Sequence, residues 1–393
     1  MTPGRRYKLF FFFSFSFLAY FLAFLPIFWE HLGFSVREIA VASMMGTVAT
    51  IVSAPFVLSL AYNSFAASRL LTPLILLGLL GFFPYLFVTE ISILIPAWFI
   101  AAFAGKGIYA LIEAQAIRDG SERDPGFEEV RIWGSYGFII ATMVLGQLVD
   151  FMGVAYLGLI GMAFMLASYS GALVCKPLLG KTVRRVESSG EIKSLGSYRG
   201  TAVALYVINL LLWASHTPLY VYLSVHLRSL DWTGGMISTA WTIGVICEIG
   251  LFLIFPWVEK RFRLVTILRS AILFAFVRWS IMANQTGVEW ILLGQFLHLF
   301  TFGACYLASV KIILGIFPES LKDKGQGYLT AIGVGLGSFL GRVAAMAMAE
   351  NYSIPEMFNV ASYVAILALP FSFLIKDVKR GREGAKPIVA VTP

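Results

Sequence analysis

A small set of ionisable side chains lies inside long apolar runs of the sequence, where a charge is costly. A charged side chain at the centre of a bilayer costs at least about 2.5 kcal/mol, so a residue retained there is a candidate for solute binding or proton transfer. Lys106 and Glu113 are seven residues apart, which is two helical turns, so both lie on one face of a helix. The full set is Lys106, Glu113, His216, Glu248, Arg278, His298 and Arg342.

Several of these residues also have a purely structural interpretation. Glu248 could form a buried ion pair with Arg278 or Arg342, as part of the packing or of a gate. His298 could form a hydrogen bond between helices, and His216 could be structural in the same way. Arg342 could also extend its side chain to the membrane surface.

The fixed charges of this set are mostly positive. With Arg131, at the border of an apolar run, four cations stand against the carboxylates of Glu113 and Glu248. A cavity with surplus positive charge suits an anionic solute. Aromatic residues near these charges, including Trp133, could stack on a ring of the solute, or could belong to interface belts and packing.

The composition excludes an ordinary water-soluble domain. The 393 residues are 59% hydrophobic and 13% charged, with a mean hydropathy of +0.81, whereas about a quarter of the residues of soluble domains are charged. The three cysteines are far apart, and the four histidines show no paired ligand spacing, so we expect no disulfide framework, metal site or enzyme active site. The net charge of +8 comes with no nucleic-acid motif, so no nucleic-acid partner is expected.

The apolar runs predict an all-α polytopic membrane protein with 12 transmembrane helices. A bilayer core of about 30 Å needs roughly 20 apolar residues per helix, and charged or turn-forming residues separate the runs. The predicted helices are 8–28, 37–60, 69–89, 92–117, 130–150, 154–176, 200–226, 233–257, 264–283, 288–316, 325–349 and 354–375. The basic start of the chain precedes an apolar run too long for a signal peptide, so we interpret that run as a retained helix. In the eleventh segment, GVGLGSFLG predicts close helix packing through small residues.

The helices fall into two groups of six around a polar stretch that is basic and rich in Gly and Ser, as a linker between bundles would be. We predict an N-terminal six-helix bundle at 1–176, a cytoplasmic linker at 177–199, a C-terminal six-helix bundle at 200–375 and a basic cytoplasmic tail at 376–393.

The distribution of Lys and Arg predicts the orientation in the membrane. With the N-terminus in the cytoplasm, nearly all of the 30 Lys and Arg lie in the termini, in cytoplasmic loops or within helices. Only Arg37 and Arg228 lie in loops on the opposite side. Cytoplasmic loops carry such an excess, so we expect a multi-pass protein of the cytoplasmic (inner) membrane, with both termini in the cytoplasm. We expect a monomer in contact with the lipid bilayer.

This organisation resembles a transporter of the major facilitator superfamily. The segment VRIWGSYGFI, from Val130 to Ile139, resembles the R-x-W/F-G-S/C-x-G element of the branch that contains lactose permease and the phenylpropionate permease. In that branch an acidic residue stands eighteen positions before the arginine, as Glu113 does before Arg131. The resemblance implies that these two residues contact the solute.

The second half supports the same resemblance. Glu248, Arg278 and His298 match the branch's glutamate, arginine and histidine on three successive helices, so the resemblance covers nearly the whole chain. In this fold the solute site lies near the midplane between halves that rock to expose it alternately. The resemblance therefore implies that the charges of both halves face one central cavity.

One departure concerns the transported proton. Three residues after the histidine, lactose permease has the glutamate that carries the proton, whereas this chain has Thr301. The resemblance leaves Glu248, Glu113 or His298 for proton coupling. Arg342 and His216 are candidates for a gating contact or ion pair.

We therefore expect a secondary active transporter that moves a small organic solute by alternating access, with proton symport and no cofactor other than the proton. The solute is an aromatic or other small carboxylate, or a sugar. An uncoupled facilitator or a proton-antiport exporter of the same fold is the alternative. The expected substrate contacts are Glu113, Arg131, Lys106, Arg278, His298 and Trp133. The sequence leaves open the solute's identity, the direction of transport, and sodium in place of the proton.

Overall fold

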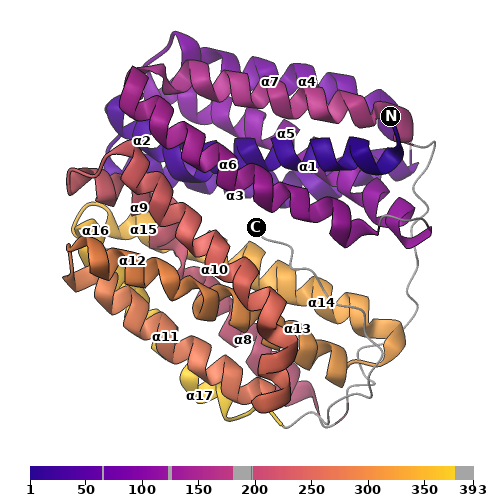
Figure 1. The fold of residues 1–393 in the computed structure, drawn as a ribbon, viewed down its shortest axis with the longest axis vertical. Helices are drawn as coiled ribbons and strands as arrows, with labels where there is room; N and C mark the ends of the chain where they lie inside the picture. The colour runs from indigo at the N-terminus through magenta and orange to yellow at the C-terminus, as the bar shows by residue number, and fades with distance from the viewer. Residues whose placement is uncertain (64–65, 123–125, 180–195, 197, 377–393) are drawn as a thin grey trace. The chain divides into compact units, whose positions relative to one another are not determined.

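The computed structural model describes residues 1–63, 66–122, 126–179, 196 and 198–376. In this part of the chain all regular secondary structure is helical, and 12 helical spans are long and apolar enough to cross a membrane (Figure 1). The predicted all-helical fold with twelve spans is therefore confirmed. Most of the predicted linker and nearly all of the predicted tail lie outside the described residues.

The first six spans contain eleven helical elements. They are α1 (Pro3–Ala19), the π-helix η1 (Tyr20–Phe24), α2 (Leu25–His31), α3 (Val36–Asn63), α4 (Ala67–Phe82), η2 (Phe83–Leu86), α5 (Ile91–Glu122), α6 (Phe127–Met152), η3 (Val154–Tyr156), α7 (Leu157–Cys175) and η4 (Lys176–Leu178).

The last six spans are interrupted more often. They comprise α8 (Arg199–Ser215), α9 (Thr217–Ser229), α10 (Gly234–Arg261), α11 (Leu264–Asn284), α12 (Val288–Phe296), the π-helix η6 (Leu299–Ala304), α13 (Cys305–Ile316), η7 (Glu319–Leu321), α14 (Lys322–Thr330), the π-helix η8 (Ala331–Gly337), α15 (Ser338–Met348), α16 (Ile354–Ile366) and α17 (Leu369–Ser372).

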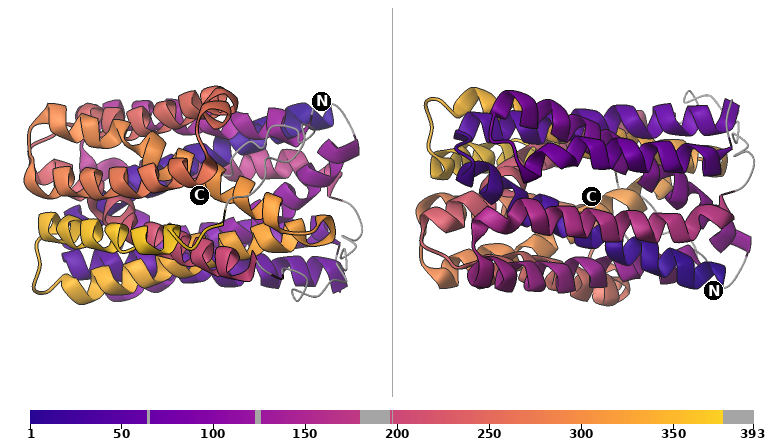
Figure 2. Two further views of the ribbon diagram at one scale, coloured as in Figure 1. Left: turned by 90° about the horizontal axis from the view of Figure 1, so that it is seen from below. Right: turned by 90° about the horizontal axis from the view of Figure 1, so that it is seen from above.

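The contacts divide the chain into two compact units. Unit 1 is Met1–Val186 together with Val221–Thr239, and unit 2 is Glu187–Tyr220 together with Ala240–Pro393. In unit 1, α1 packs on α6 and α7, and α5 packs on α3 and α4. In unit 2, α11 packs on α16 and α13, and α8 packs on η8. Within each unit the long helices run roughly along one direction (Figure 2).

Two prolines account for breaks in the spans. Pro26 is the second residue of α2 and Pro218 the second residue of α9. A proline has no N–H to donate, and its ring clashes with the carbonyl four residues earlier, so the preceding helix ends or widens there. The first span widens into η1 before Pro26, and the seventh breaks at His216 before Pro218. The second of these breaks places His216 at the C-cap of α8.

Glycines in η8 and α15 allow those helices to approach α8 closely. A Cβ at Gly337 would lie 2.7 Å from the carbonyl oxygen of Leu210, and a Cβ at Gly341 would lie 2.7 Å from that of Ala214. Neither position has room for a side chain. The predicted close packing through the GVGLGSFLG segment is therefore confirmed.

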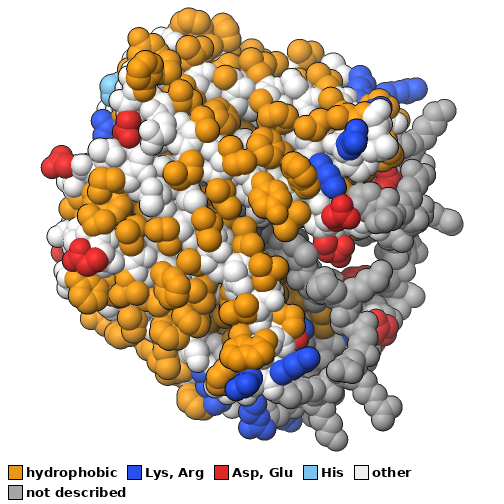
Figure 3. All heavy atoms as spheres, viewed as in Figure 1, with side chains coloured by type: hydrophobic (Ala, Val, Ile, Leu, Met, Phe, Trp, Pro, Cys, Tyr) orange, Lys and Arg blue, Asp and Glu red, His pale blue; other side chains and the backbone are white. Residues whose placement is uncertain are grey.

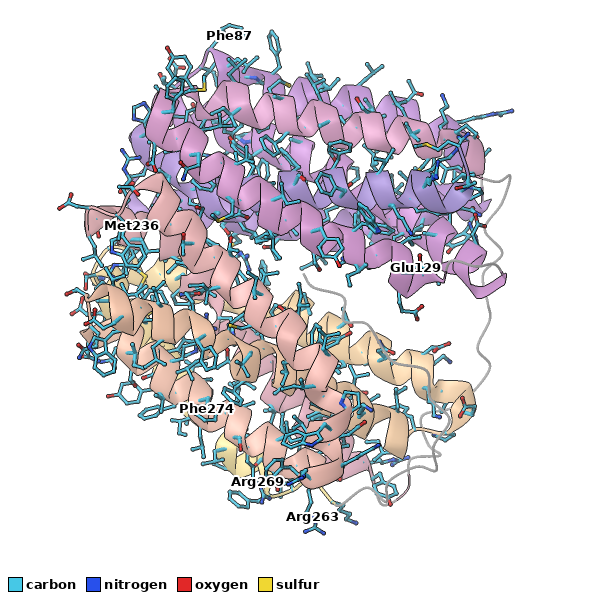
Figure 4. The ribbon with its side chains drawn as sticks, in the orientation of Figure 1. Phe87, Glu129, Met236, Arg263, Arg269 and Phe274 are labelled. Carbon is cyan, nitrogen blue, oxygen red and sulfur yellow. The ribbon has the colours of Figure 1, made fainter. Side chains whose placement is uncertain are left out.

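Exposed apolar side chains cover the outside of the spans. Figure 3 shows hydrophobic side chains over most of the visible face, with charged side chains toward its margins. On α4 and η2, Leu76, Leu80, Phe83 and Phe87 recur at helical spacing and are 55–74% exposed. Phe87, the residue after η2, projects outward (Figure 4). Such a surface is unfavourable in water and suits contact with lipid.

Candidate functional site

A cluster of charged residues in unit 1 is built on one face of α5. Tyr109 Oη donates a hydrogen bond to Glu113 Oε1 at 2.8 Å, and the Lys106 ammonium lies 5.7 Å from the centre of the Tyr109 ring. Lys106, Tyr109 and Glu113 share this face because they are spaced by three and four residues. The sequence spacing of Lys106 and Glu113 therefore predicted their common face correctly.

Arg131 completes this cluster from α6. Its side chain is 2% exposed, and its charge acts on Glu113 together with that of Lys106. Two rings of α1 hold the guanidinium, whose Cζ lies 4.0 Å from the centre of Phe15 and 5.7 Å from that of Phe11. A buried cation over an aromatic face is stabilised by about 2 kcal/mol. The aromatic residues of α1 thus position the arginine of α6.

Trp133 lies away from this cluster. It is two residues beyond Arg131 on α6, so the two side chains point to different faces of the helix. Its ring is 40% exposed, lies 5.9 Å from the Lys8 ammonium, and meets Tyr136 edge to face. Lys8 also pairs with Glu129, in the first turn of α6 (Figure 4), at 2.8 Å. The structure does not bring Trp133 together with the other predicted solute contacts of unit 1.

Arg278 is the centre of a second cluster, in unit 2. Its side chain is fully buried. Its Nη1 lies 2.9 Å from His298 Nδ1 and 2.9 Å from Thr301 Oγ1, and its Nη2 donates to Gln295 Oε1 at 3.3 Å. Its Cζ also lies 4.5 Å from the centre of the Trp279 ring. Thr301, Gln295 and Trp279 are neutral, and His298 can be neutral.

His216 joins the same cluster through Thr301. Its Nε2 lies 3.3 Å from Thr301 Oγ1, and its Nδ1 lies 2.7 Å from the carbonyl oxygen of Leu212. Trp279 holds the ring edge to face at 4.9 Å and is itself fixed by donating its indole N–H to Ser215 Oγ at 3.2 Å. A pocket beside the cluster is lined by polar and aromatic side chains. They include Asn209, Trp213, His216, Thr301 and Tyr306.

Glu248 supplies the carboxylate of the second cluster. It is 2% exposed, and its Oε2 lies 3.8 Å from His298 Nε2. The charges of Glu248, Arg278 and Arg342 all act on the Tyr220 phenol. Arg342 is 7% exposed and donates to the carbonyl oxygen of Ser338 at 3.2 Å. The structure thus gathers Glu248, Arg278 and His298 in one cluster of unit 2.

Sequence reasoning missed Gln295. It lies three residues before His298, so both side chains reach the same side of the helix, and it is 2% exposed. A neutral amide inside an apolar run is the signal that could have identified it. Thr301 was noted only as a departure, whereas the structure places its hydroxyl between Arg278 and His216. Among the described residues, no group of three or more His, Cys, Asp or Glu could hold a metal ion.

Known proteins resemble this chain in sequence and fold. In Escherichia coli (strain K12), a protein named for 3-phenylpropionic acid transport is 25% identical over 252 residues, which are 63% of this chain and 64%, just under two thirds, of that relative. YegT of the same strain, named for nucleoside transport, is 23% identical over 372 residues, 88% of this chain and 87% of that relative. The crystal structure of the nucleoside transporter NupG has a TM-score of 0.79 at 18% identity, covering 96% of this chain and 100% of that chain.

The twelve apolar spans of the described residues and these similarities indicate a secondary transporter of the major facilitator type rather than an enzyme. The family model for the MFS_1 like family matches residues 5–360, so the chain belongs to that family.

Proposed function

We propose that the chain is a proton-coupled symporter for a small organic anion, an aromatic or other small carboxylate, which it moves by alternating access. The observation that carries this proposal is the charge of the two clusters. Unit 1 groups Glu113 with two cations, and unit 2 groups Glu248 with two cations. With neutral histidines, each cluster therefore has one surplus positive charge. A carboxylate solute offsets such a surplus, whereas a neutral solute does not.

Proton coupling follows from the same charges. A monoanion adds one negative charge and a proton adds one positive charge, so a carrier loaded with both has the net charge of the empty carrier. Moving one net charge against a membrane potential costs about 2.3 kcal/mol per 100 mV. A monoanion carried together with a proton adds no net charge to the carrier, so its entry avoids that cost. We propose Glu113, Arg131 and Lys106 as solute contacts in unit 1, and Arg278 and His298 in unit 2.

The aromatic character of the proposed solute rests on similarity. The relative named for 3-phenylpropionic acid transport supports an aromatic carboxylate. YegT, named for nucleoside transport, supports a neutral aromatic solute as the second candidate, and the Glu113 and Arg131 pair suits a sugar. We further propose that the protein is a monomer of the cytoplasmic (inner) membrane with both termini inside. An uncoupled facilitator or a proton-antiport exporter remains the alternative mechanism.

Counterflow in proteoliposomes tests the solute class. Vesicles loaded with unlabelled solute take up a labelled pool of the same solute if a carrier exchanges it, whatever the coupling and direction. We expect counterflow with 3-phenylpropionate and not with a nucleoside or maltose. Counterflow of the nucleoside or the sugar, with none of 3-phenylpropionate, would contradict the carboxylate proposal.

A matched pair of variants ties the activity to the cluster. Glu113→Gln removes the buried carboxylate of unit 1, whereas Glu289→Gln removes an exposed carboxylate at the start of α12. Glu113→Gln raises the surplus positive charge of this cluster from one to two, so we expect it to hold the carboxylate solute more tightly and release it more slowly. Counterflow should therefore fall at least about tenfold, equal to about 1.4 kcal/mol. The Glu289→Gln protein should match the wild type. Equal activity of the two variants would separate Glu113 from solute binding.

A further inference from the structure

The hydrogen-bond roles of two histidines in unit 2 bear on which residue carries the coupled proton. His216 Nδ1 lies 2.7 Å from the carbonyl oxygen of Leu212. A carbonyl oxygen only accepts, so Nδ1 carries the hydrogen, and Nε2 of the neutral ring is an acceptor. Thr301 Oγ1, at 3.3 Å from Nε2, therefore donates its hydroxyl hydrogen to His216.

Thr301 connects this histidine with Arg278. A guanidinium only donates, so Arg278 Nη1 donates to Thr301 Oγ1 at 2.9 Å. The hydroxyl accepts one hydrogen from Arg278 and gives its own to His216. The hydrogen bonds thus run in one direction, from Arg278 through Thr301 and His216 to the carbonyl of Leu212.

The same guanidinium fixes the protonation of His298. Arg278 Nη1 lies 2.9 Å from His298 Nδ1 and can only donate, so Nδ1 carries no hydrogen. The neutral ring then has its hydrogen on Nε2, which lies 3.8 Å from Glu248 Oε2. Phe302 stacks on the imidazole at 5.1 Å and holds its plane. His298 therefore presents an N–H toward the carboxylate of Glu248.

A second proton on either histidine conflicts with this network. On His298 it would have to sit on Nδ1, where it would meet the donating N–H of Arg278. On His216 it would place a further positive charge beside Arg278, in an interior where these side chains are 0–8% exposed. Of the groups in this network, the carboxylate of Glu248 gains a proton without breaking any of these hydrogen bonds.

We propose that Glu248 carries the coupled proton, and that His298 and Thr301 are positioning residues that remain neutral. This inference rests on the function proposed above. An O–H bond forms on Glu248 with a proton from the solution on the side of entry, and the bond breaks when the proton leaves on the other side. Arg278 donates to His298 Nδ1 and so keeps this nitrogen free of hydrogen. Thr301 accepts from the same Nη1 and fixes the position of the guanidinium.

Other charged and titratable groups face this cluster as well. Tyr220, on α9, interacts with Glu248, Arg278 and Arg342, and its ring lies 6.3 Å from that of His216. Arg342, on α15, is the second cation. A protonated Glu248 leaves both cations without a negative charge in the cluster, so protonation strengthens the attraction for a carboxylate solute. This provides the coupling between proton and anion.

Separating accumulation from exchange tests the role of Glu248. For a one-to-one symporter, a gradient of one pH unit supports about tenfold accumulation, because one unit equals about 1.4 kcal/mol. We compare uptake before the undissociated acid has equilibrated through the bilayer, after subtracting uptake into protein-free liposomes. On this measure we expect wild type and Glu289→Gln to accumulate 3-phenylpropionate toward that ratio, and Glu248→Gln to show counterflow without accumulation. Accumulation by Glu248→Gln at the wild-type ratio would overturn the inference. Absence of all counterflow in the folded wild type would instead contradict the proposed function.

Two substitutions of His298 by residues with an amide side chain, Asn and Gln, test whether His298 carries the proton. Asn places an acceptor where Nδ1 was, Gln places a donor where Nε2 was, and neither holds an extra proton. Because His298 is also a proposed solute contact, we expect both variants to transport more slowly, but at least one of His298→Asn and His298→Gln should still reach the wild-type accumulation ratio. Counterflow without accumulation in both variants would show that His298 itself carries the proton, and would overturn the inference.

The pH profile tests Thr301. Thr301→Val removes the acceptor for Arg278 while preserving the shape, so the hold on His298 loosens and this histidine becomes free to protonate. We expect counterflow of Thr301→Val to fall at least about threefold between about pH 7 and 5, the range in which an unperturbed histidine titrates. Thr301→Ser, which keeps the hydroxyl, should show the wild-type profile. Identical pH profiles of counterflow for Thr301→Val and Thr301→Ser would contradict a positioning role for Thr301.

Discussion

Gly134 leaves the space that the Arg131 guanidinium occupies, and Gly134→Ala tests whether that position matters for solute binding. A Cβ at position 134 would lie 2.9 Å from Arg131 Nη1 and 2.9 Å from Phe15 Cδ2. Carbon atoms reach favourable contact at about 3.5 Å, so both groups must move by about half an ångström or more. The guanidinium is the far end of a flexible chain, so we expect it to move further than the ring.

The magnitude follows from the contact that is disturbed. The guanidinium lies 4.0 Å from the centre of Phe15, and a desolvated contact of this kind contributes about 2 kcal/mol. If Gly134→Ala removes half to all of this stabilisation from the binding-competent position of Arg131, carboxylate binding loses about 1–2 kcal/mol. The dissociation constant then rises by about 5- to 30-fold. Alanine is about 1 kcal/mol more favourable than glycine within a helix, which offsets part of the strain on folding.

The assay is equilibrium binding of labelled 3-phenylpropionate to purified protein in lipid nanodiscs, with thermal unfolding measured on the same samples. Gly105→Ala is the matched control, because its Cβ would meet only Tyr169 Oη, at 3.9 Å. We expect weaker binding for Gly134→Ala at a nearly unchanged unfolding temperature, and wild-type binding for Gly105→Ala. Unchanged binding in Gly134→Ala, or an equal loss in both variants, would refute the argument.

Two further predictions concern stability. Gly341→Ala places a methyl group against Thr217 and should lower the free energy of unfolding by about 1–3 kcal/mol. Gly335→Ala, whose added methyl group would meet nothing within 4 Å, should leave this free energy unchanged. Thermal unfolding measures both, and a comparable loss in the two variants would contradict this packing. Asp150 accepts from the backbone N–H of Gly234 at 2.6 Å at the start of α10, so Asp150→Ala should cost about 1–2 kcal/mol. Hydrogen exchange at the Gly234 amide should accelerate by at least about tenfold, and wild-type exchange there would contradict the capping role.

The spans of the fold were predictable because a bilayer imposes a length and an apolar composition that the sequence records directly. The helix break before Pro218 could also be predicted from the sequence, since proline disrupts the helix in which it lies. The π-helix η6 after His298 could not be predicted from the sequence. The extra residue in its turn depends on packing against neighbouring helices rather than on residue types. The membership of 221–239 in unit 1 likewise depends on contacts between segments distant in sequence.

The candidate site was predictable where its members share a helix. Lys106 and Glu113 were assigned to one face from their spacing alone, and the structure adds Tyr109 between them. The contact of Phe15 with Arg131 joins residues more than a hundred positions apart and has no local signature. The role of Thr301 was hidden for the same reason, because a threonine in an apolar run is ordinary until its partners are known.

Simultaneous recording of proton and solute entry tests the central claim most directly. Proteoliposomes with wild-type protein, an internal pH indicator and a clamped membrane potential are given labelled 3-phenylpropionate on the outside. The account predicts that the interior acidifies as the solute enters, faster than in protein-free liposomes, where only the undissociated acid crosses. The carrier-mediated part brings one proton per molecule and does not depend on the membrane potential, since a proton and a monoanion are neutral together. Carrier-mediated solute entry at constant internal pH would contradict proton symport, and internal alkalinisation would indicate proton antiport.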